Sequence, residues 1–289
     1  MNINYELYKV FYYVAKNLSF SIASSQLFLS QSAVSQSIKT LEKNLNTTLF
    51  YRSTKKVTLT HEGTLLLKHI EPAINLIKSG ENCISETQAL ERGVIHLGAS
   101  DTICKYILIP YLQQFHSDYP NIHIQVTNRT SIKCVDLLRQ GTVDFIITNI
   151  PNKTISSTMS ITEFHQFNDI FIAGNKFKNL QNKILSLEEL SNYPLLMLEK
   201  NTTTSHYIYD IFNSHNINIK PEVELGSIDL LVELAKINLG ISFVPDYCVQ
   251  DDLIPLKVRE VIPKRKLAIV TNKSIPLSFA AKKFISYMV

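Results

Sequence analysis

The apolar residues of the first fifty positions recur at helical spacing and predict three helices. Tyr5 to Asn17 is expected to form the first helix. The second is short, begins after a cap at Ser19 or Ser21, and carries Ala23 and Leu27 on one face. Ser30 is expected to cap the third helix, which runs to about Asn46.

The third helix separates an apolar stripe from a polar, basic face. The stripe consists of Val34, Ile38, Leu41 and Leu45, and the polar face consists of Ser32, Ser35, Gln36, Lys39 and Lys43. Small side chains allow close approach to DNA, glutamine can pair with a base edge, and lysine can bind guanine or phosphate. Such a face is equally typical of an ordinary solvated helix. The short helix before it, at helix-turn-helix spacing, favours DNA recognition.

Two short strands with a basic turn between them follow the third helix. Leu49–Arg52 and Val57–Leu59 are the predicted strands, and Lys55 and Lys56 lie in the turn. A hairpin of this kind can lie along the phosphate backbone as a wing. The charge distribution agrees with this, because Met1–Thr60 has seven Lys and Arg residues against two Glu residues, a net +5, whereas the rest of the chain is near neutral.

Four segments of this region together resemble the signature of the LysR-type transcriptional regulators. They are FSIASSQL at 20–27, SQSAVSQSIKTLE at 30–42, LFYR at 49–52 and LTHEG at 59–63. Ala33 stands where the family often has proline, although alanine is also common there. The resemblance implies that the groove-facing residues are Ser32, Ala33, Ser35, Gln36 and Lys39, and that Arg52 approaches the backbone. Gln31, at the start of the third helix, and Lys55 and Lys56, in the basic turn, complete the predicted set of DNA contacts. The resemblance also implies double-stranded DNA and a small-molecule effector as partners.

A long helix is predicted from Glu62 to about Leu90, after a cap at Thr60. Its apolar stripe consists of Leu66, Ile70, Ile74 and Ile77. The resemblance implies that two such helices pair in a dimer, and that the protein is a homodimer or homotetramer. The alternative is that the helix packs onto the body of its own chain. Pro72 is expected to kink the helix, because an internal proline removes a backbone hydrogen bond.

From Gly93 onward, strands and helices alternate in the pattern of a parallel α/β fold. The pattern occurs twice, which predicts two halves with a cleft between them. The predicted fold class is therefore α/β, with a winged helix-turn-helix (1–59), a linker helix (60–91) and a two-part domain (92–289). The resemblance to the LysR-type regulators implies that this last part is an effector domain similar to periplasmic binding proteins. The first half is expected at about 92–162 and 267–289, and the second at about 163–266.

Ligands in such folds bind at the carboxyl ends of the strands, where helices begin. The polar residues at these positions are Ser100, Thr102, Asn128, Asn149, Thr202 and Thr203. Hydroxyl groups and free helix amides suit a small anion. Each residue alone is as typical of an ordinary helix cap. Asp101 is an exception, since an acid there either points away or recognises an amino group.

Composition and motifs leave little room for other function classes. The chain is 45% hydrophobic and 19% charged, as globular proteins are, with no apolar run long enough to cross a membrane and no leader-like segment, so a cytoplasmic location is expected. The four cysteines are widely spaced and are expected to be free thiols, with a redox pair as the alternative. No catalytic or metal-binding motif occurs, so no enzyme activity, cofactor or metal is expected. A solute-binding protein without a DNA role remains the rival hypothesis.

Overall fold

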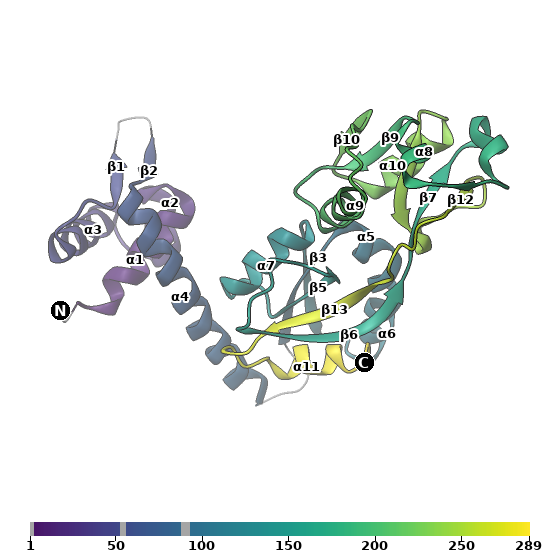
Figure 1. The fold of residues 1–289 in the computed structure, drawn as a ribbon. Helices are drawn as coiled ribbons and strands as arrows, with labels where there is room; N and C mark the ends of the chain where they lie inside the picture. The colour runs from purple at the N-terminus through teal and green to yellow at the C-terminus, as the bar shows by residue number, and fades with distance from the viewer. Residues whose placement is uncertain (1–2, 53–55, 88–92) are drawn as a thin grey trace. The chain divides into compact units, whose positions relative to one another are not determined.

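The computed structural model describes residues 3–52, 56–87 and 93–289. The chain divides into two compact units, made chiefly of residues 1–81 and of residues 82–289. Figure 1 shows the elements of each unit. In the described parts of the chain, no helix has both the length and the apolar character that crossing a membrane requires.

The N-terminal unit begins with three helices, at the positions that the apolar pattern predicts: α1 (Tyr5–Asn17), α2 (Phe20–Leu27) and α3 (Gln31–Leu45). Ser19, not Ser21, caps α2, because its side chain accepts a hydrogen bond from the amide of Ile22. Ser30 caps α3 by accepting from the amide of Ala33 at 3.1 Å. Val34, Ile38 and Leu41 are fully buried against α1, so the apolar stripe of α3 is its core face.

A hairpin and a long helix complete this unit. β1 (Phe50–Arg52) pairs antiparallel with β2 (Val57–Leu59), and α4 (His61–Thr87) begins after Thr60, which accepts from the amide of Gly63. Position 63 requires glycine, because a Cβ there would lie 2.2 Å from the carbonyl oxygen of Leu49. The close approach fixes the start of α4 against the hairpin.

The apolar stripe predicted for α4 is divided between two roles. Leu66 and Ile70 are partly buried against the core of the N-terminal unit, which agrees with the alternative of packing on the chain's own body, and the pairing of two such helices stays a prediction. The large apolar side chains that α4 exposes in this unit are Leu65, Leu76 and Ile77. The helix continues through Pro72.

The C-terminal unit contains two sheets (Figure 1). The five-stranded sheet has the order β4-β3-β5-β13-β6, with bounds Ile122–Asn128, Gly93–Ala99, Phe145–Ile150, Arg265–Asn272 and Met159–Phe167. The six-stranded sheet has the order β10-β9-β11-β7-β12-β8, with bounds Val223–Leu225, Leu195–Leu198, Ile241–Pro245, Asp169–Ala173, Ile254–Val258 and Ile184–Leu185.

Each sheet combines a parallel part with antiparallel strands. β4, β3 and β5 are parallel, as are β10, β9 and β11. The parallel pattern predicted from the sequence fails at two strands: β13 is antiparallel to both of its neighbours, and β7 is antiparallel to β11 and β12, whereas β12 and β8 are again parallel. β7 and β13 are each the first strand after the chain has passed from one sheet to the other.

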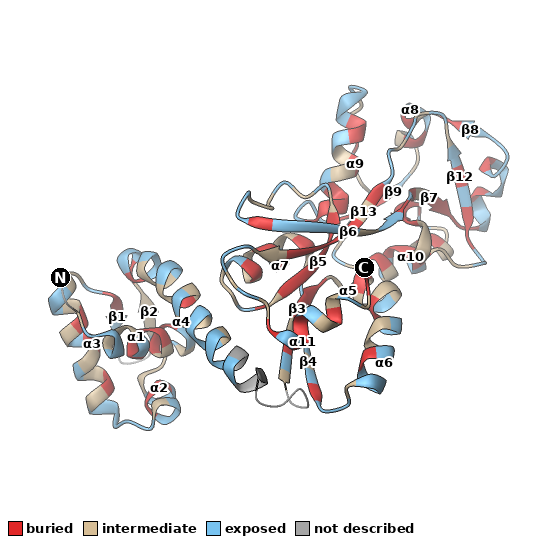
Figure 2. Ribbon diagram, turned by 90° about the horizontal axis from the view of Figure 1, so that it is seen from below, coloured by how far each residue is buried: buried red, intermediate tan, exposed pale blue. Residues whose placement is uncertain are grey.

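Helices cover both faces of each sheet. Those of the five-stranded sheet are α5 (Asp101–Ile103), the π-helical turn η1 (Cys104–Leu108), α6 (Ile109–Asp118), α7 (Ser131–Arg139) and α11 (Phe279–Ile285). Those of the six-stranded sheet are η2 (Asn175–Leu180), α8 (Leu187–Ser191), α9 (Thr203–Ser214), α10 (Ile228–Lys236) and η3 (Asp246–Cys248). Consecutive residues of β5 enter opposite core clusters, Phe145 under α11 and Ile146 under α7, so the strand is buried throughout (Figure 2).

The two sheets define the two halves of this unit. The first half comprises residues 93–167 and 265–289, and the second comprises residues 169–258; the chain crosses between them at Asn168 and again at 259–264. The predicted boundary at 162 falls inside β6, which pairs with β13 as far as Phe167, and is therefore corrected. β6 was missed because its outer residues are polar and it is an edge strand.

Candidate functional site

The outer face of α3 is accessible, as a helix that enters a DNA groove must be. Gln31, Ser32, Gln36 and Lys39 are exposed, while Ala33 and Ser35 are half-buried at the side of the face. The hydroxyl groups of Ser32 and Ser30 lie 2.9 Å apart. Gln36 and Lys39 are the longer of the exposed side chains in the middle of this face.

Arg52 of the hairpin is held beside this face. Its guanidinium pairs with Glu42 at 3.0 Å, lies 3.4 Å from the hydroxyl of Ser35, and faces the ring of Phe20. Arg52, which was predicted to contact DNA, thus lies beside α3. Lys56 is exposed on the hairpin, and Lys55 lies outside the described residues.

Glu42 fixes the hairpin to α3, a role that the sequence did not reveal. Its Oε1 accepts hydrogen bonds from the amides of Leu49 and Phe50, and its Oε2 pairs with Arg52. The side chain is only 15% exposed. In the sequence, Glu42 stands out only as one of two acidic residues in a basic segment. That pattern does not show that its partners are Arg52 and the amides of the hairpin. The geometry makes α3 and the hairpin a single rigid surface.

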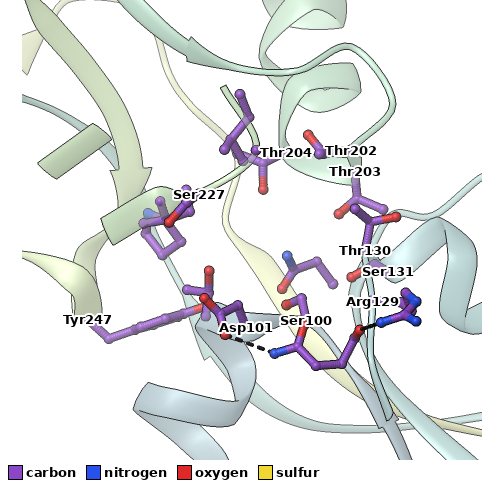
Figure 3. A pocket seen from close by; sticks show the side chains of 17 residues that line it. Ser100, Asp101, Arg129, Thr130, Ser131, Thr202, Thr203, Thr204, Ser227 and Tyr247 are labelled. Carbon is purple, nitrogen blue, oxygen red and sulfur yellow. Dashed lines mark hydrogen bonds between the residues drawn. The ribbon is translucent and has the colours of Figure 1, made fainter. Parts of the chain in front are cut away.

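A cavity of about 130 Å³ lies between the two halves of the C-terminal unit (Figure 3). All six residues predicted for the effector contribute to its lining: Ser100, Thr102, Asn128, Asn149, Thr202 and Thr203. Further lining residues include Asp101, Arg129, Thr130, Ser131, Thr204, Ser227 and Tyr247. Figure 3 shows Thr202–Thr204 facing Ser100 and Asp101 across the cavity. The carboxyl ends of strands from both sheets therefore meet at one site.

Ser227 and Tyr247 are among the lining residues that sequence reasoning missed. Ser227 caps α10 directly after β10, so it obeys the rule that identified the other residues. Tyr247 lies in the turn after β11, where no pattern marks it. Burial raises the pKa of its phenol well above the usual range, so Tyr247 remains neutral.

Helix N-termini from both halves open onto the cavity. Thr202 caps α9 by accepting from the amide of Ser205 at 3.1 Å, and Ser227 caps α10 by accepting from the amide of Leu230. Ser100 stands at the cap position of α5, but its hydroxyl makes no cap hydrogen bond. Exposed amides and the positive ends of helix dipoles make such a site favourable for an anion.

One acidic and one basic side chain line the cavity, and both are hydrogen-bonded to Asn128, the last residue of β4. Asp101 accepts a hydrogen bond from the side chain of Asn128 at 2.8 Å, and Arg129 donates to the backbone carbonyl of Asn128 at 2.6 Å. Asp101 is therefore oriented by a neighbour. Two buried atoms of lining residues, Asn149 Oδ1 and the Tyr247 hydroxyl, have no hydrogen-bond partner within the described structure.

Two kinds of chemical site, a metal-binding cluster and a reactive thiol, depend on the placement and surroundings of the described His, Cys, Asp and Glu side chains. No group of three or more His, Cys, Asp or Glu side chains among them is placed to hold a metal ion. Cys104, Cys134 and Cys248 are free, and burial raises the pKa of Cys104 to about 11 and that of Cys134 to about 12. These groups are neutral thiols near pH 7 and hence weak nucleophiles. The side chain of Cys83 lies outside the described residues.

Two family models together match most of the chain. The model described as "Bacterial regulatory helix-turn-helix protein, lysR family" matches residues 5–64, and "LysR substrate binding domain" matches residues 88–289. Among curated proteins, the chain is 29% identical over 294 residues to the "HTH-type transcriptional activator CmpR" of Synechocystis sp., covering 99% of this chain and 95% of CmpR.

Solved structures share the fold at low sequence identity. Full-length CbnR complexed with its target DNA has a TM-score of 0.68 at 16% identity, with 99% of both chains covered. The regulatory domain of CcmR from Synechocystis, in complex with 2-PG, has a TM-score of 0.62 at 21% identity and covers 68% of this chain and 96% of that domain.

Proposed function

The chain belongs to the LysR family of DNA-binding transcriptional regulators, and from this premise we propose that it senses a small anionic metabolite and that paired chains read two DNA half-sites through α3. The observation that carries the sensing part is the cavity between the halves of the C-terminal unit, lined by helix N-termini, hydroxyl groups and Arg129.

The DNA part of the proposal is supported by the exposed face of α3. Gln36 can pair with a base edge in the major groove, whereas Lys39 and the basic hairpin supply sequence-independent attraction to phosphate. CbnR, which shares the fold, has been solved with its target DNA. A role on DNA would place the protein in the cytoplasm of its cell.

The exposed side chains of α4 support the pairing of two chains. Leu65, Leu76 and Ile77 are between 43% and 60% exposed, which is costly for large apolar groups in water. Pairing through α4 would cover them in a homodimer, and further contacts would build a homotetramer. Effector binding in the cavity would then alter how the subunits pack and how far apart the DNA-binding units lie.

The effector class follows from the shape and charge of the cavity. A volume of about 130 Å³ suits a molecule of a few heavy atoms, and the helix N-termini favour a carboxylate or phosphate group. CcmR, another protein of this fold, was solved with 2-PG, which makes that compound a rational first probe.

A thermal-shift screen against 2-PG, small carboxylates, amino acids and inorganic oxyanions tests the proposal. A ligand present at about 100 times its Kd should stabilise the protein by roughly 2.7 kcal/mol. Thr202→Ala should abolish this shift while DNA affinity is kept. Because the substitution also removes a helix cap, Ser278→Ala is the matched control: Ser278 caps α11 away from the cavity, and this variant should keep the shift. A shift unchanged in Thr202→Ala, or lost equally in both variants, would contradict the assignment of the cavity.

A further inference from the structure

A π-helical turn interrupts the helix that follows β3. α5, η1 and α6 form one continuous helical segment, in which the residues of η1 are wound more widely. Ile103 and Leu108 stay fully buried in the core of the first half. Tyr106, between them, packs against the core cluster of the second half, and its ring lies 6.0 Å from that of Tyr247. Wide turns of this kind re-aim side chains and are frequent at functional positions.

Two neighbouring residues of η1 converge on one carboxylate of the second half. The Tyr106 hydroxyl donates to Asp229 Oδ1 at 2.7 Å, and Lys105 Nζ donates to the same oxygen at 2.9 Å. Burial alone would raise the pKa of Asp229, but the hydrogen bonds from Tyr106 and Lys105 outweigh it and lower the pKa below its usual range. The group is therefore ionised near neutral pH, and hydrogen bonds to a charged acceptor are the stronger kind.

Both ends of this contact adjoin the walls of the cavity. Asp229 lies in the first turn of α10, directly after the lining residues Ser227 and Ile228. On the other side, η1 follows the lining residues Asp101 and Thr102 within the same helical segment. A contact between Asp229 and η1 thus joins one wall of the cavity to the other.

We propose that Asp229 is a positioning residue that holds the two walls of the effector cavity together by accepting the hydrogen bonds of Tyr106 and Lys105. The inference rests on the proposed function, since that identifies the cavity as the effector site. In physical terms, the contact sets the distance between the two halves before an effector binds. A domain already held at this spacing loses less freedom when an effector binds.

Another ion pair between the halves, exposed to solvent, provides a matched comparison. Lys153 and Asp210 lie 2.6 Å apart, but their side chains are 74% and 57% exposed, against 50% and 33% for Lys105 and Asp229. An isolated pair of such exposure contributes little. Of these two carboxylates, Asp229 accepts from a partly buried tyrosine and Asp210 does not among the described contacts, so the two pairs should behave differently.

Hydrogen–deuterium exchange on the ligand-free, full-length protein tests the proposal. Tyr106→Phe removes only a hydroxyl group, and Asp229→Ala removes the acceptor. Each should speed amide exchange about three- to tenfold both in residues 101–108 and in the first turn of α10, and the double variant should be no faster than Asp229→Ala. Asp210→Ala should leave both segments unchanged.

Several results would overturn the positioning role. One is faster amide exchange confined to α10, which would mean that Asp229 supports only that helix. The others are additive effects on exchange in the double variant, or an equal increase in exchange in Asp210→Ala. No effector is needed for this measurement. A failed ligand screen would therefore count against the anionic effector, and would leave the exchange result to decide the role of Asp229.

Discussion

Replacing Arg265 with methionine should lower the free energy of unfolding of the C-terminal unit by about 3–5 kcal/mol. Arg265 begins β13 and Asp169 begins β7, so the pair joins the halves where the chain crosses between them. Both side chains are fully buried, and the guanidinium makes two hydrogen bonds to the carboxylate. Removing one partner leaves the other charge buried without compensation.

Arg265 also supports the wall of the cavity. Its Nη2 donates to Thr204 in the first turn of α9, and the guanidinium faces the rings of Phe167 and Tyr207. Phe167 belongs to the first half, and Tyr207 to the second. We therefore expect the methionine variant to lose effector response as well as stability.

Denaturant unfolding followed by circular dichroism measures the effect, and two further variants make it decisive. Lys266→Met removes the neighbouring, half-exposed partner of Glu163 and should cost less than about 1 kcal/mol. Asp169→Asn combined with Arg265→Met removes both charges and should recover much of the loss. A double variant as unstable as Arg265→Met would show that lost packing, and not the orphaned charge, dominates.

The Arg265→Met variant should also be more sensitive to alkaline than to acidic conditions. Burial raises the pKa of Asp169, and Arg265 opposes that effect in the native protein. Without the arginine, a protonated Asp169 carries no uncompensated charge, so the deficit should be smaller at pH 5 than at pH 8. A deficit independent of pH would mean that water reaches the carboxylate.

DNA affinity should fall by about 10³–10⁵ between 50 and 200 mM salt, the largest change that we expect in the protein's behaviour. Lys39, Lys43, Arg52 and Lys56 are exposed on the N-terminal unit, and a pair of chains presents two such sets. Each phosphate contact releases counterions when DNA binds, which makes affinity fall with salt concentration.

Fluorescence anisotropy with a random-sequence duplex at several salt concentrations measures this slope. Lys39→Ala should make the slope shallower by about 1 for each phosphate contact removed, on any duplex sequence. Lys236→Ala is the charge-matched control, because Lys236 lies in the C-terminal unit and pairs with Glu233. A flat salt dependence would favour the solute-binding protein without a DNA role.

Local patterns along the chain predicted most of the N-terminal unit and the cavity lining. The bounds of α1 and the caps Ser30 and Thr60 depend on neighbours within a few residues, which sequence periodicity records. The lining residues were found because strand ends and helix starts adjoin in sequence. Their part in binding an effector remains a prediction.

The sequence could not predict features that depend on distant pairing. Asp169 and Arg265 are far apart in the chain, and each alone resembles a surface charge. The edge strand β6 pairs with β13, β7 pairs with β11, and β12 pairs with β7, so the place of each strand depends on a partner outside its own segment of the sequence. Likewise, whether Leu66 or Leu65 of α4 faces the core depends on the helix orientation that Gly63 fixes.

The most direct test of the account compares Gln36→Ala with the native protein on two duplexes at one salt concentration. The first duplex is selected by the native protein from a random-sequence pool, and the second is unselected. Loss of a base contact should weaken binding to the selected duplex by about 1–3 kcal/mol, and leave affinity for the unselected duplex unchanged. Equal affinity losses on both duplexes, or none on either, would contradict sequence reading by α3.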